Sequence, residues 1–383
     1  MTAPRERAEV GTFEDIQTAA ARTTGLEDFG DPAYEEGLRI LVDDLASPEA
    51  GLTPQGNAFH RAQVKSALVG RLLTEARFAQ HPEHRDVPIE RPVFVTGLPR
   101  TGTTALHRLL CADPGHQGLE AWLTEFPQPR PPRETWESDP IFQALQSAYQ
   151  QHHVSHPEFM GIHYLDATSV EECWRVLRQT GKSIGFESLA NIPRYAAWLA
   201  GQDWTDAYRR HRANLQLVGL HDQDRRWVLK NPSHLVALDA LMAVYPDALV
   251  VVCHRDPVTS IASACSLSAE ATAGTSTTFV GTTIGRTQLA MLGRSWRTFA
   301  AARTAYDPAQ FVDVDYRAFV ADPVGTVGRI YDAFGIGWTQ RARDEVARID
   351  AASRTGRARP AHAYALADYG LSEEQVRAAF TSA

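Results

Sequence analysis

Arg-Pro-Val-Phe-Val-Thr-Gly-Leu-Pro-Arg-Thr-Gly-Thr-Thr occupies residues 91–104 of the chain. Its first six residues form a short, β-rich apolar run that ends before a glycine, which predicts a buried strand. A helix is predicted from about Thr103 to Ala112, because leucines recur there on one face and Asp113-Pro114 would end it. The stretch therefore predicts a strand, a glycine-rich turn and a helix in direct succession.

Further strand–helix units follow in the second half of the chain. Strands are predicted at 226–230, 248–253 and 311–316, and helices at 235–245, from 256 onward and at 323–334. Such alternation favours parallel pairing of the strands, with helices on both faces of the sheet. We therefore expect an α/β fold.

Long helical stretches flank this alternating part. Residues 1–90 and 133–222 have apolar residues at helical spacing, which predicts large helical insertions or a cap over the sheet. Residues 127–132, Pro-Gln-Pro-Arg-Pro-Pro, predict an exposed loop. We expect one compact unit, in which a helical N-terminal region (1–90) packs on an α/β domain (91–383) that carries a helical insertion at about 133–222.

The composition bounds the function classes. Of 383 residues, 44% are apolar and 22% are charged, as in ordinary globular proteins. Lys plus Arg number 38 and Asp plus Glu 46, a net charge of −8, which argues against nucleic-acid binding through a basic surface. The chain has no apolar stretch of the about 18 residues that cross a bilayer, and its start lacks a signal-peptide pattern. Its four cysteines form no His/Cys cluster, so we expect no metal site, in a cytoplasmic protein whose oligomeric state stays open, a homo-oligomer included.

Gly97 and Gly102 give the turn the G-x-x-x-x-G spacing of a phosphate-binding loop. Glycines let successive N–H groups point into a cradle, and the N-terminus of the following helix adds partial positive charge. Thr103 stands where a nucleoside triphosphatase has the Lys that reaches the β- and γ-phosphates, while Arg100 brings a cation from inside the loop. The pattern indicates a nucleotide without a γ-phosphate, and a strand–helix turn without a ligand is the alternative.

A second candidate anion site follows the strand at 248–253. Arg255 lies where parallel strands of α/β folds end and bind ligands, and Ser263 follows about two helical turns later. A guanidinium and a hydroxyl suit a terminal phosphate. The alternative is an Arg255–Asp256 ion pair, with Ser263 as a small residue in helix packing.

Residues 99–104, Pro-Arg-Thr-Gly-Thr-Thr, resemble the first signature of the nucleotide-dependent sulfotransferases: Pro or Arg, Lys or Arg, Ser or Thr, Gly, Thr, then Ser or Thr. These enzymes use 3′-phosphoadenylyl sulfate (PAPS) as a co-substrate. The resemblance implies that the loop binds the 5′-phosphosulfate of PAPS through Arg100, Thr101, Gly102, Thr103 and Thr104. It also implies that Arg255 and Ser263, at the family's spacing of eight residues, bind the 3′-phosphate.

Two weaker matches concern the rest of the nucleotide. The resemblance implies that Tyr316 contacts the adenine, and a half-buried Tyr that closes a strand is the alternative. It also implies basic residues that close over the 3′-phosphate, and a solvated basic loop explains them equally well: Arg354, Arg357 and Arg359.

The catalytic residues follow from the same resemblance. Lys230 ends a predicted strand and would stabilise the leaving oxygen. Three residues are candidates for the general base: His163, Glu120 and Glu172. The segment 163–173 resembles an H…P-E-E-C stretch of one bacterial branch, with Val170 at the expected Pro, although Glu172 is equally explained as a first-turn acid of a helix. Leu123 replaces the acidic residue expected after Trp122, which favours His163; His234 is an outside candidate.

We therefore expect a P-loop-like parallel β-sheet flanked by helices, with large helical insertions that form a cap. The predicted function is in-line transfer of a sulfuryl group from PAPS to a hydroxyl, or as second choice an amine, of a small-molecule acceptor. Two alternatives stay open: a P-loop nucleotide kinase or hydrolase, and a sulfotransferase-fold protein that binds the nucleotide without turnover. The missing Lys at position 103 counts against the kinase.

Overall fold

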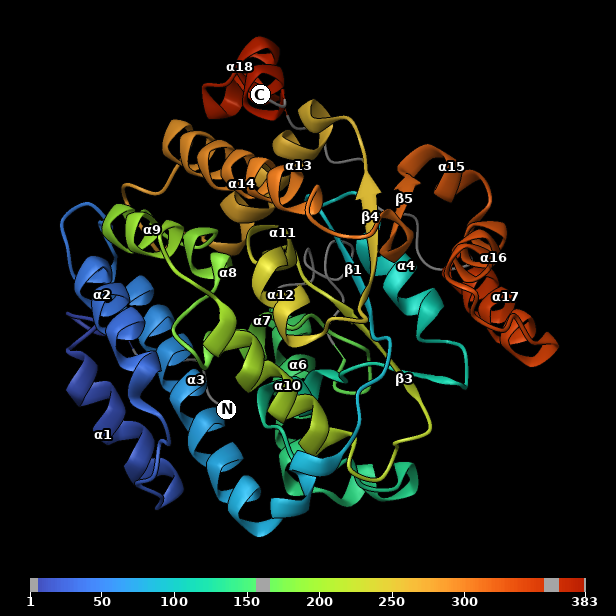
Figure 1. The fold of residues 1–383 in the computed structure, drawn as a ribbon. Coiled ribbons are helices and arrows are strands. Elements are labelled where there is room, and N and C mark those ends of the chain that lie inside the picture. Colours follow the sequence, from blue (N-terminus) through green and yellow to red (C-terminus); the bar gives the residue numbers. More distant parts are fainter. Residues whose placement is uncertain (1–5, 156–165, 355–364, 382–383) are drawn as a thin grey trace.

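Five parallel strands form one sheet, in the order β2-β3-β1-β4-β5, in the computed structural model of the chain (Figure 1). The model describes residues 6–155, 166–354 and 365–381. The strands are β1 Val93–Gly97, β2 His116–Gln117, β3 Arg226–Lys230, β4 Leu249–His254 and β5 Phe311–Asp315. Because all pairs are parallel, the carboxyl ends of the strands meet at one edge, where α/β folds bind their ligands.

Alternate residues of the central strands enter two separate cores. Phe94 and Val250 belong to one apolar cluster, whereas their neighbours Val95 and Val251 belong to the other. Successive side chains of a strand point to opposite faces, so both faces of the sheet are buried. The near-continuous apolar runs of β1 and β4 are explained by this double burial.

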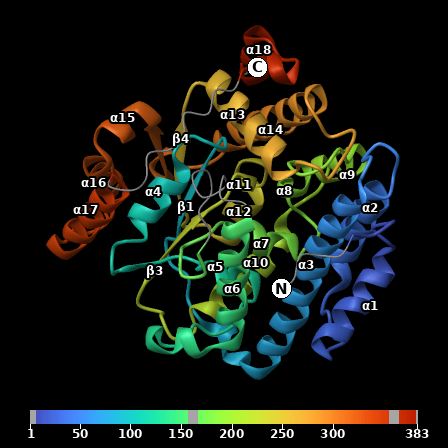
Figure 2. The ribbon, with the colours of Figure 1, turned by 180° about the vertical axis from the view of Figure 1, so that it is seen from behind.

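Helices cover each face of the sheet. One face is covered by α4 Thr103–Leu110, α16 Pro323–Phe334 and α17 Gln340–Arg354. The other is covered by α11 Ser233–Val236, α12 Leu238–Val244, α13 Pro257–Ala271 and α14 Thr282–Arg303. The short α15 Tyr316–Ala321 follows β5, and α18 Glu373–Phe380 packs on α13 and α14, as the view from behind also shows (Figure 2).

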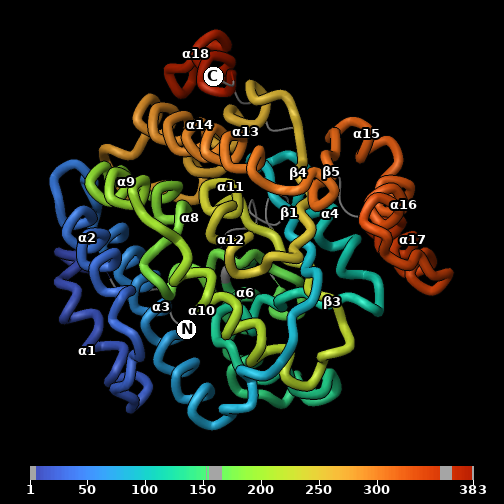
Figure 3. The backbone as a smooth tube through the Cα atoms, in the orientation of Figure 1, coloured from blue at the N-terminus to red at the C-terminus, as the bar shows by residue number. Residues whose placement is uncertain are grey.

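The first long helical stretch lies on the side of the molecule away from α16 and α17, and the helices of the second stretch pack against it (Figures 1 and 3). The first contains α1 Phe13–Thr24, α2 Glu35–Leu45 and α3 Pro54–Gln80. The second contains α5 Ala121–Glu125, α6 Pro140–Ser155, α7 Trp174–Arg178, α8 Ile184–Glu187, α9 Pro193–Ala200 and α10 Thr205–Val218. Short 3₁₀ helices lie at Pro32–Tyr34, Pro82–Asp86, Arg133–Ser138, Pro308–Gln310 and Leu366–Tyr369. The expected α/β fold with a helical cap is confirmed.

Most predicted elements have the expected place, with two differences in detail. The helix predicted at 235–245 is divided into α11 and α12, because Ala237 between them has non-helical angles of φ −116° and ψ 26°. The strand β2 was not predicted, since two residues carry no periodic pattern. Among the described residues, no helix combines the length and the apolar character needed to cross a membrane.

Residues 127–132 form a loop, as predicted, but the prediction that this loop is exposed holds only for Pro132. Pro127, Gln128 and Arg130 are buried. The amide of Arg130 donates to the carbonyl oxygen of Val218 at the end of α10, 3.1 Å away. The Arg130 guanidinium forms ion pairs with Glu120 and Asp222, and these contacts hold the proline-rich segment in the interior.

Candidate active site at the carboxyl edge of the sheet

The turn between β1 and α4 needs glycine at two positions. Gly97 has φ 146°, and a Cβ there would lie 2.5 Å from the carbonyl oxygen of Cys253 on β4. Gly102, the N-cap of α4, has φ 88°, and its Cβ would lie 3.2 Å from the rings of Tyr316 and Phe319. Positive φ angles favour glycine at both positions. The missing side chain of Gly102 also lets the loop backbone approach Tyr316 and Phe319, which follow β5.

The loop presents its backbone donors at the start of α4. The first turn of a helix leaves its N–H groups without intrahelical partners. The Leu106 amide donates to the carbonyl oxygen of the N-cap Gly102, 3.0 Å away. The Thr101 hydroxyl closes the turn by donating to the Leu98 carbonyl oxygen, 2.7 Å. Arg100 has φ 70°, a left-handed conformation that non-glycine residues adopt rarely and that concentrates at functional sites. This geometry suits an anion such as a phosphate.

The second candidate anion site contacts this loop directly. Arg100 Nε donates to Ser263 Oγ on α13, 3.2 Å, and Arg255 Nη1 donates to the Arg100 carbonyl oxygen, 2.9 Å. The Asp256 carboxylate caps α13 by accepting from the Thr259 amide, 3.2 Å. The two motifs, which are some 150 residues apart in the sequence, therefore form one basic cluster at the edge of the sheet.

Tyr316 joins the same cluster. The guanidinium carbon of Arg255 lies 4.2 Å from the centre of the Tyr316 ring, a cation–π contact. A cavity of about 210 Å³ opens beside Arg255. It is lined by Leu98, Thr101, Cys253, His254, Arg255, Pro257, Trp296 and Phe380.

Lys230 lies next to the loop at the end of β3. Its backbone pairs with Val95 of β1, which places the side chain at the start of α4. The Nζ atom donates to Thr104 Oγ1, 3.1 Å, and forms an ion pair with the Glu172 carboxylate. The Lys230 side chain is 3% exposed and that of Glu172 23%, so the lysine is buried while its carboxylate partner reaches solvent. The Cys173 amide donates to the Lys230 carbonyl, 3.0 Å, and fixes this pairing at the backbone.

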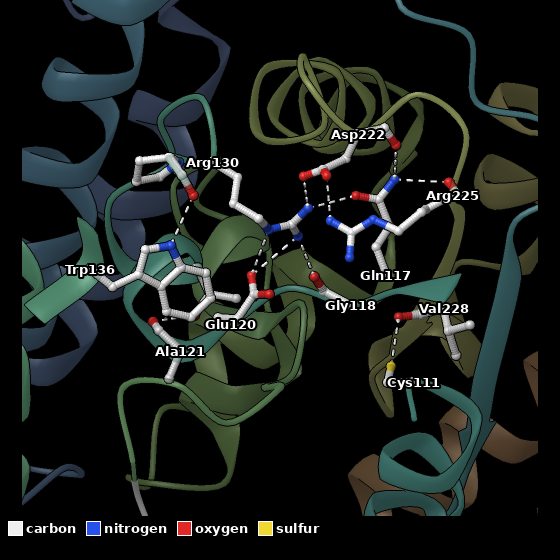
Figure 4. A network of polar contacts seen from close by, with 12 residues as sticks. Cys111, Gln117, Gly118, Glu120, Ala121, Arg130, Trp136, Asp222, Arg225 and Val228 are labelled. Atoms are coloured by element: carbon white, nitrogen blue, oxygen red, sulfur yellow. Dashed lines mark hydrogen bonds and ion pairs between the residues drawn. The ribbon is translucent and has the colours of Figure 1, made fainter. Parts of the chain in front are cut away.

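Glu120 lies in a different group, around Arg130 (Figure 4). The Glu120 carboxylate pairs with Arg130, Nη2 to Oε2 3.1 Å, and its side chain is 14% exposed. The same guanidinium contacts Asp222, the Gln117 side chain and the Gly118 carbonyl, each at 2.7 Å. The structure thus separates the predicted carboxylates: Glu172 contacts Lys230, and Glu120 contacts Arg130. Arg130 was missed in the sequence, because nothing around it in the chain indicates its distant partners.

The remaining predicted residues lie in the core, at the end of a helix or outside the described residues. His234 is buried, its Nδ1 is 2.6 Å from the Tyr208 hydroxyl, and burial lowers its pKa well below the usual value. Arg354 ends α17. Three candidates fall outside the described ranges: His163, Arg357 and Arg359. In the described part of the chain, no three His, Cys, Asp or Glu side chains are grouped to hold a metal ion.

Known proteins resemble this chain over most of its length. A model described as "Sulfotransferase family" matches residues 92–340. The crystal structure of sulfotransferase STF1 from Mycobacterium tuberculosis H37Rv superposes with a TM-score of 0.91 and 51% identity, covering 98% of this chain and 99% of that one. Sulfotransferase STF9 from Mycobacterium avium gives a TM-score of 0.87 at 29% identity, with 98% and 96% covered.

A curated relative is more distant. Omega-hydroxy-beta-dihydromenaquinone-9 sulfotransferase Stf3 from Mycobacterium tuberculosis (strain CDC 1551 / Oshkosh) is 24% identical over 253 residues. The match covers 64% of this chain and 63% of Stf3, so it spans less than two thirds of that relative.

Proposed function

The chain belongs to the sulfotransferase family, and from that premise we propose that it moves a sulfuryl group from PAPS to a hydroxyl of a small-molecule acceptor. One observation carries this proposal. Lys230 Nζ contacts both Thr104 of the phosphate-type loop and the carboxylate of Glu172. A cation for a leaving oxygen and a carboxylate for an acceptor proton therefore meet beside an anion cradle.

The donor would be held along the edge of the sheet. The amides at the start of α4, the hydroxyls of Thr103 and Thr104, and Arg100 would bind the 5′-phosphosulfate. Arg255 and Ser263 would bind the 3′-phosphate, which their direct contacts with Arg100 support. The Tyr316 ring beside them would contact the adenine.

The chemistry needs charge stabilisation and alignment more than covalent help. The acceptor oxygen forms a bond to sulfur as the bond from sulfur to the 5′-phosphate oxygen breaks. By analogy with phosphoryl transfer, negative charge grows on that leaving oxygen. The Lys230 ammonium would stabilise this charge.

Glu172 is our choice for the general base. Its carboxylate is partly exposed and lies at Lys230, so it could accept the proton that the acceptor hydroxyl loses. The Glu120 carboxylate is held by Arg130, which argues for a structural role. His163 stays a candidate.

The name of one relative supports a hydroxyl as the acceptor group. The name of Stf3 specifies an omega-hydroxy-beta-dihydromenaquinone, so it indicates a hydroxyl as the group that accepts the sulfuryl group in that protein. We extend only this group to the present chain, with an amine as second choice.

Calorimetric titration with 3′-phosphoadenosine 5′-phosphate, beside ATP with Mg²⁺, tests the donor site. We expect the former to bind at micromolar concentration and Arg255→Ala to abolish this binding. Arg348→Ala, at an exposed position of α17, is the matched control and should bind normally. Binding of ATP alone, or of neither nucleotide, would contradict the proposal.

Turnover is tested separately, by incubating PAPS with a panel of hydroxyl compounds and measuring release of the product nucleotide. Acceptor-dependent release is the expected result. Nucleotide binding without release from any hydroxyl or amine acceptor would favour a sulfotransferase-fold binding protein without turnover.

A further inference from the structure

Arg130 is a buried cation with several protein partners near the candidate active site. Its side chain is 5% exposed, and each of its three side-chain nitrogen atoms has protein partners (Figure 4). Nε donates to the Glu120 carboxylate, Nη1 donates to Gln117 Oε1 and Asp222 Oδ2, and Nη2 donates to the Gly118 carbonyl oxygen. Nη2 also lies 3.1 Å from Glu120 Oε2, an ion pair. The guanidinium also lies 5.5 Å from the Trp227 ring.

This arrangement has a desolvation cost, which suggests that it serves a purpose beyond stability. Burying one cation with two carboxylates removes three charges from water, and well-packed apolar residues often stabilise a fold as much. Three of the four bonded groups belong to one short segment, residues 117–120, which follows the loop helix α4. Arg130 therefore fixes the shape of a stretch of backbone that has little regular structure of its own.

That stretch holds the segment that carries Glu172. The Glu171 amide donates to the Leu119 carbonyl, 2.7 Å, and the Ala121 amide donates to the Ser169 carbonyl, 2.9 Å. An antiparallel bridge joins residues 120 and 170 between these two bonds. A Cβ on Gly118 would lie 2.8 Å from a methyl group of Val170, so the Val170 side chain packs closely against the Gly118 backbone.

The second segment then ends at the reacting group. Glu172 pairs with Lys230, and the next amide, that of Cys173, donates to the Lys230 carbonyl. We propose that Arg130 is a positioning residue, which clamps residues 117–120 and through them residues 167–172, and so sets the Glu172 carboxylate against Lys230. This inference rests on the proposed function, because it assigns the position of the proposed base.

Arg130→Lys keeps the charge and loses the five-donor fork. We expect kcat to fall about 10²-fold, the loss that a misplacement of about 1 Å brings, with unchanged affinity for 3′-phosphoadenosine 5′-phosphate. In a Glu172→Gln background the same change should cost less than about threefold, because the group that Arg130 positions is already lost. Equal losses in the two backgrounds, or no loss in either, would overturn the proposal.

Arg210→Lys is the matched control. Arg210, whose side chain is 11% exposed, is also an arginine paired with a carboxylate, that of Glu75, but it joins α10 to α3. It should lower stability and act equally in the two backgrounds. An Arg210 variant that showed the same dependence on Glu172 would assign the effect of Arg130 to general loosening of the fold.

Amide hydrogen exchange tests the clamp without using turnover. In Arg130→Lys, the amides of residues 168–173 should exchange about tenfold faster, while those of β1 and β4 are unchanged. Unchanged exchange at 168–173 would overturn the clamp. Faster exchange in a chain that transfers no sulfuryl group would support the clamp and contradict the proposed function, so the two failures are distinguishable.

Discussion

Two cation–carboxylate pairs lie on either side of one backbone bridge, and they differ in how fully the cation is bonded. Each of the three side-chain nitrogen atoms of Arg130 has protein partners, Glu120 among them, and we call this guanidinium saturated. Lys230 contacts Glu172 and Thr104, which among the described residues leaves one of its three ammonium donors for a ligand. A saturated guanidinium can only fix structure, whereas an unsaturated ammonium beside an anion cradle can act on a substrate.

Removal of Lys230, the unsaturated cation, should have the largest effect on the rate of sulfuryl transfer. We expect Lys230→Ala to lower the single-turnover rate of sulfuryl transfer about 10³-fold, because the ammonium that would stabilise the leaving oxygen is lost. Rapid-quench measurement with saturating PAPS checks this. Lys65→Ala on α3 is the control and should keep the rate. A loss of less than tenfold in Lys230→Ala would remove the lysine from the chemistry.

Changing the carboxylate of the same pair should have the next largest effect. Glu172→Gln should lower kcat about 10²-fold, at the low end of what a general base supplies, since a loose transition state demands little help with the acceptor proton. Steady-state kinetics with saturating PAPS measures this loss. A full rate in Glu172→Gln, together with an about 10²-fold loss in His163→Asn, would transfer the role to His163.

Much of the fold could be predicted because its signals are local. The apolar runs of β1 and β4 and the helical spacing at 323–334 each predict an element from neighbouring residues alone. β2 could not be predicted, because its two residues are a strand only through pairing with Arg226 and Trp227 of β3. The burial of Pro127, Gln128 and Arg130 could not be predicted either. Prolines indicate a break in regular structure, but they do not indicate which side chains an arginine contacts.

The site shows the same division. The spacing of Gly97 and Gly102, and that of Arg255 and Ser263, predicted two anion motifs, and the structure brings them into contact through Arg100. The sequence could not choose between the two carboxylates, because Glu120 and Glu172 are the same residue type and their spatial partners lie far away in the chain. Only the fold shows that one meets a saturated arginine and the other a lysine at the loop.

A smaller effect, on nucleotide affinity, is expected from a change of Ser263 in the basic cluster. Ser263→Ala removes one hydroxyl that accepts from Arg100, so the affinity for 3′-phosphoadenosine 5′-phosphate should fall about tenfold by calorimetry. Adenosine 5′-phosphate, which lacks the 3′-phosphate, serves as the internal control and should bind the variant and the parent chain equally. Equal losses for both nucleotides would place Ser263 in loop structure and leave the 3′-phosphate to other groups.

The smallest effect is expected from the carboxylate of the saturated pair. Glu120→Gln keeps the shape and one oxygen acceptor for Arg130, so the clamp on residues 117–120 should largely hold. We expect kcat to fall about threefold, far less than the about 10²-fold or more that loss of a base brings. The free energy of unfolding, from urea titration, should fall by about 1–2 kcal/mol, because the buried guanidinium exchanges an ionic acceptor for a neutral one. A 10²-fold loss of kcat at full stability would reverse the assignment and make Glu120 the base, since a residue that only supports Arg130 cannot remove activity without loosening the fold.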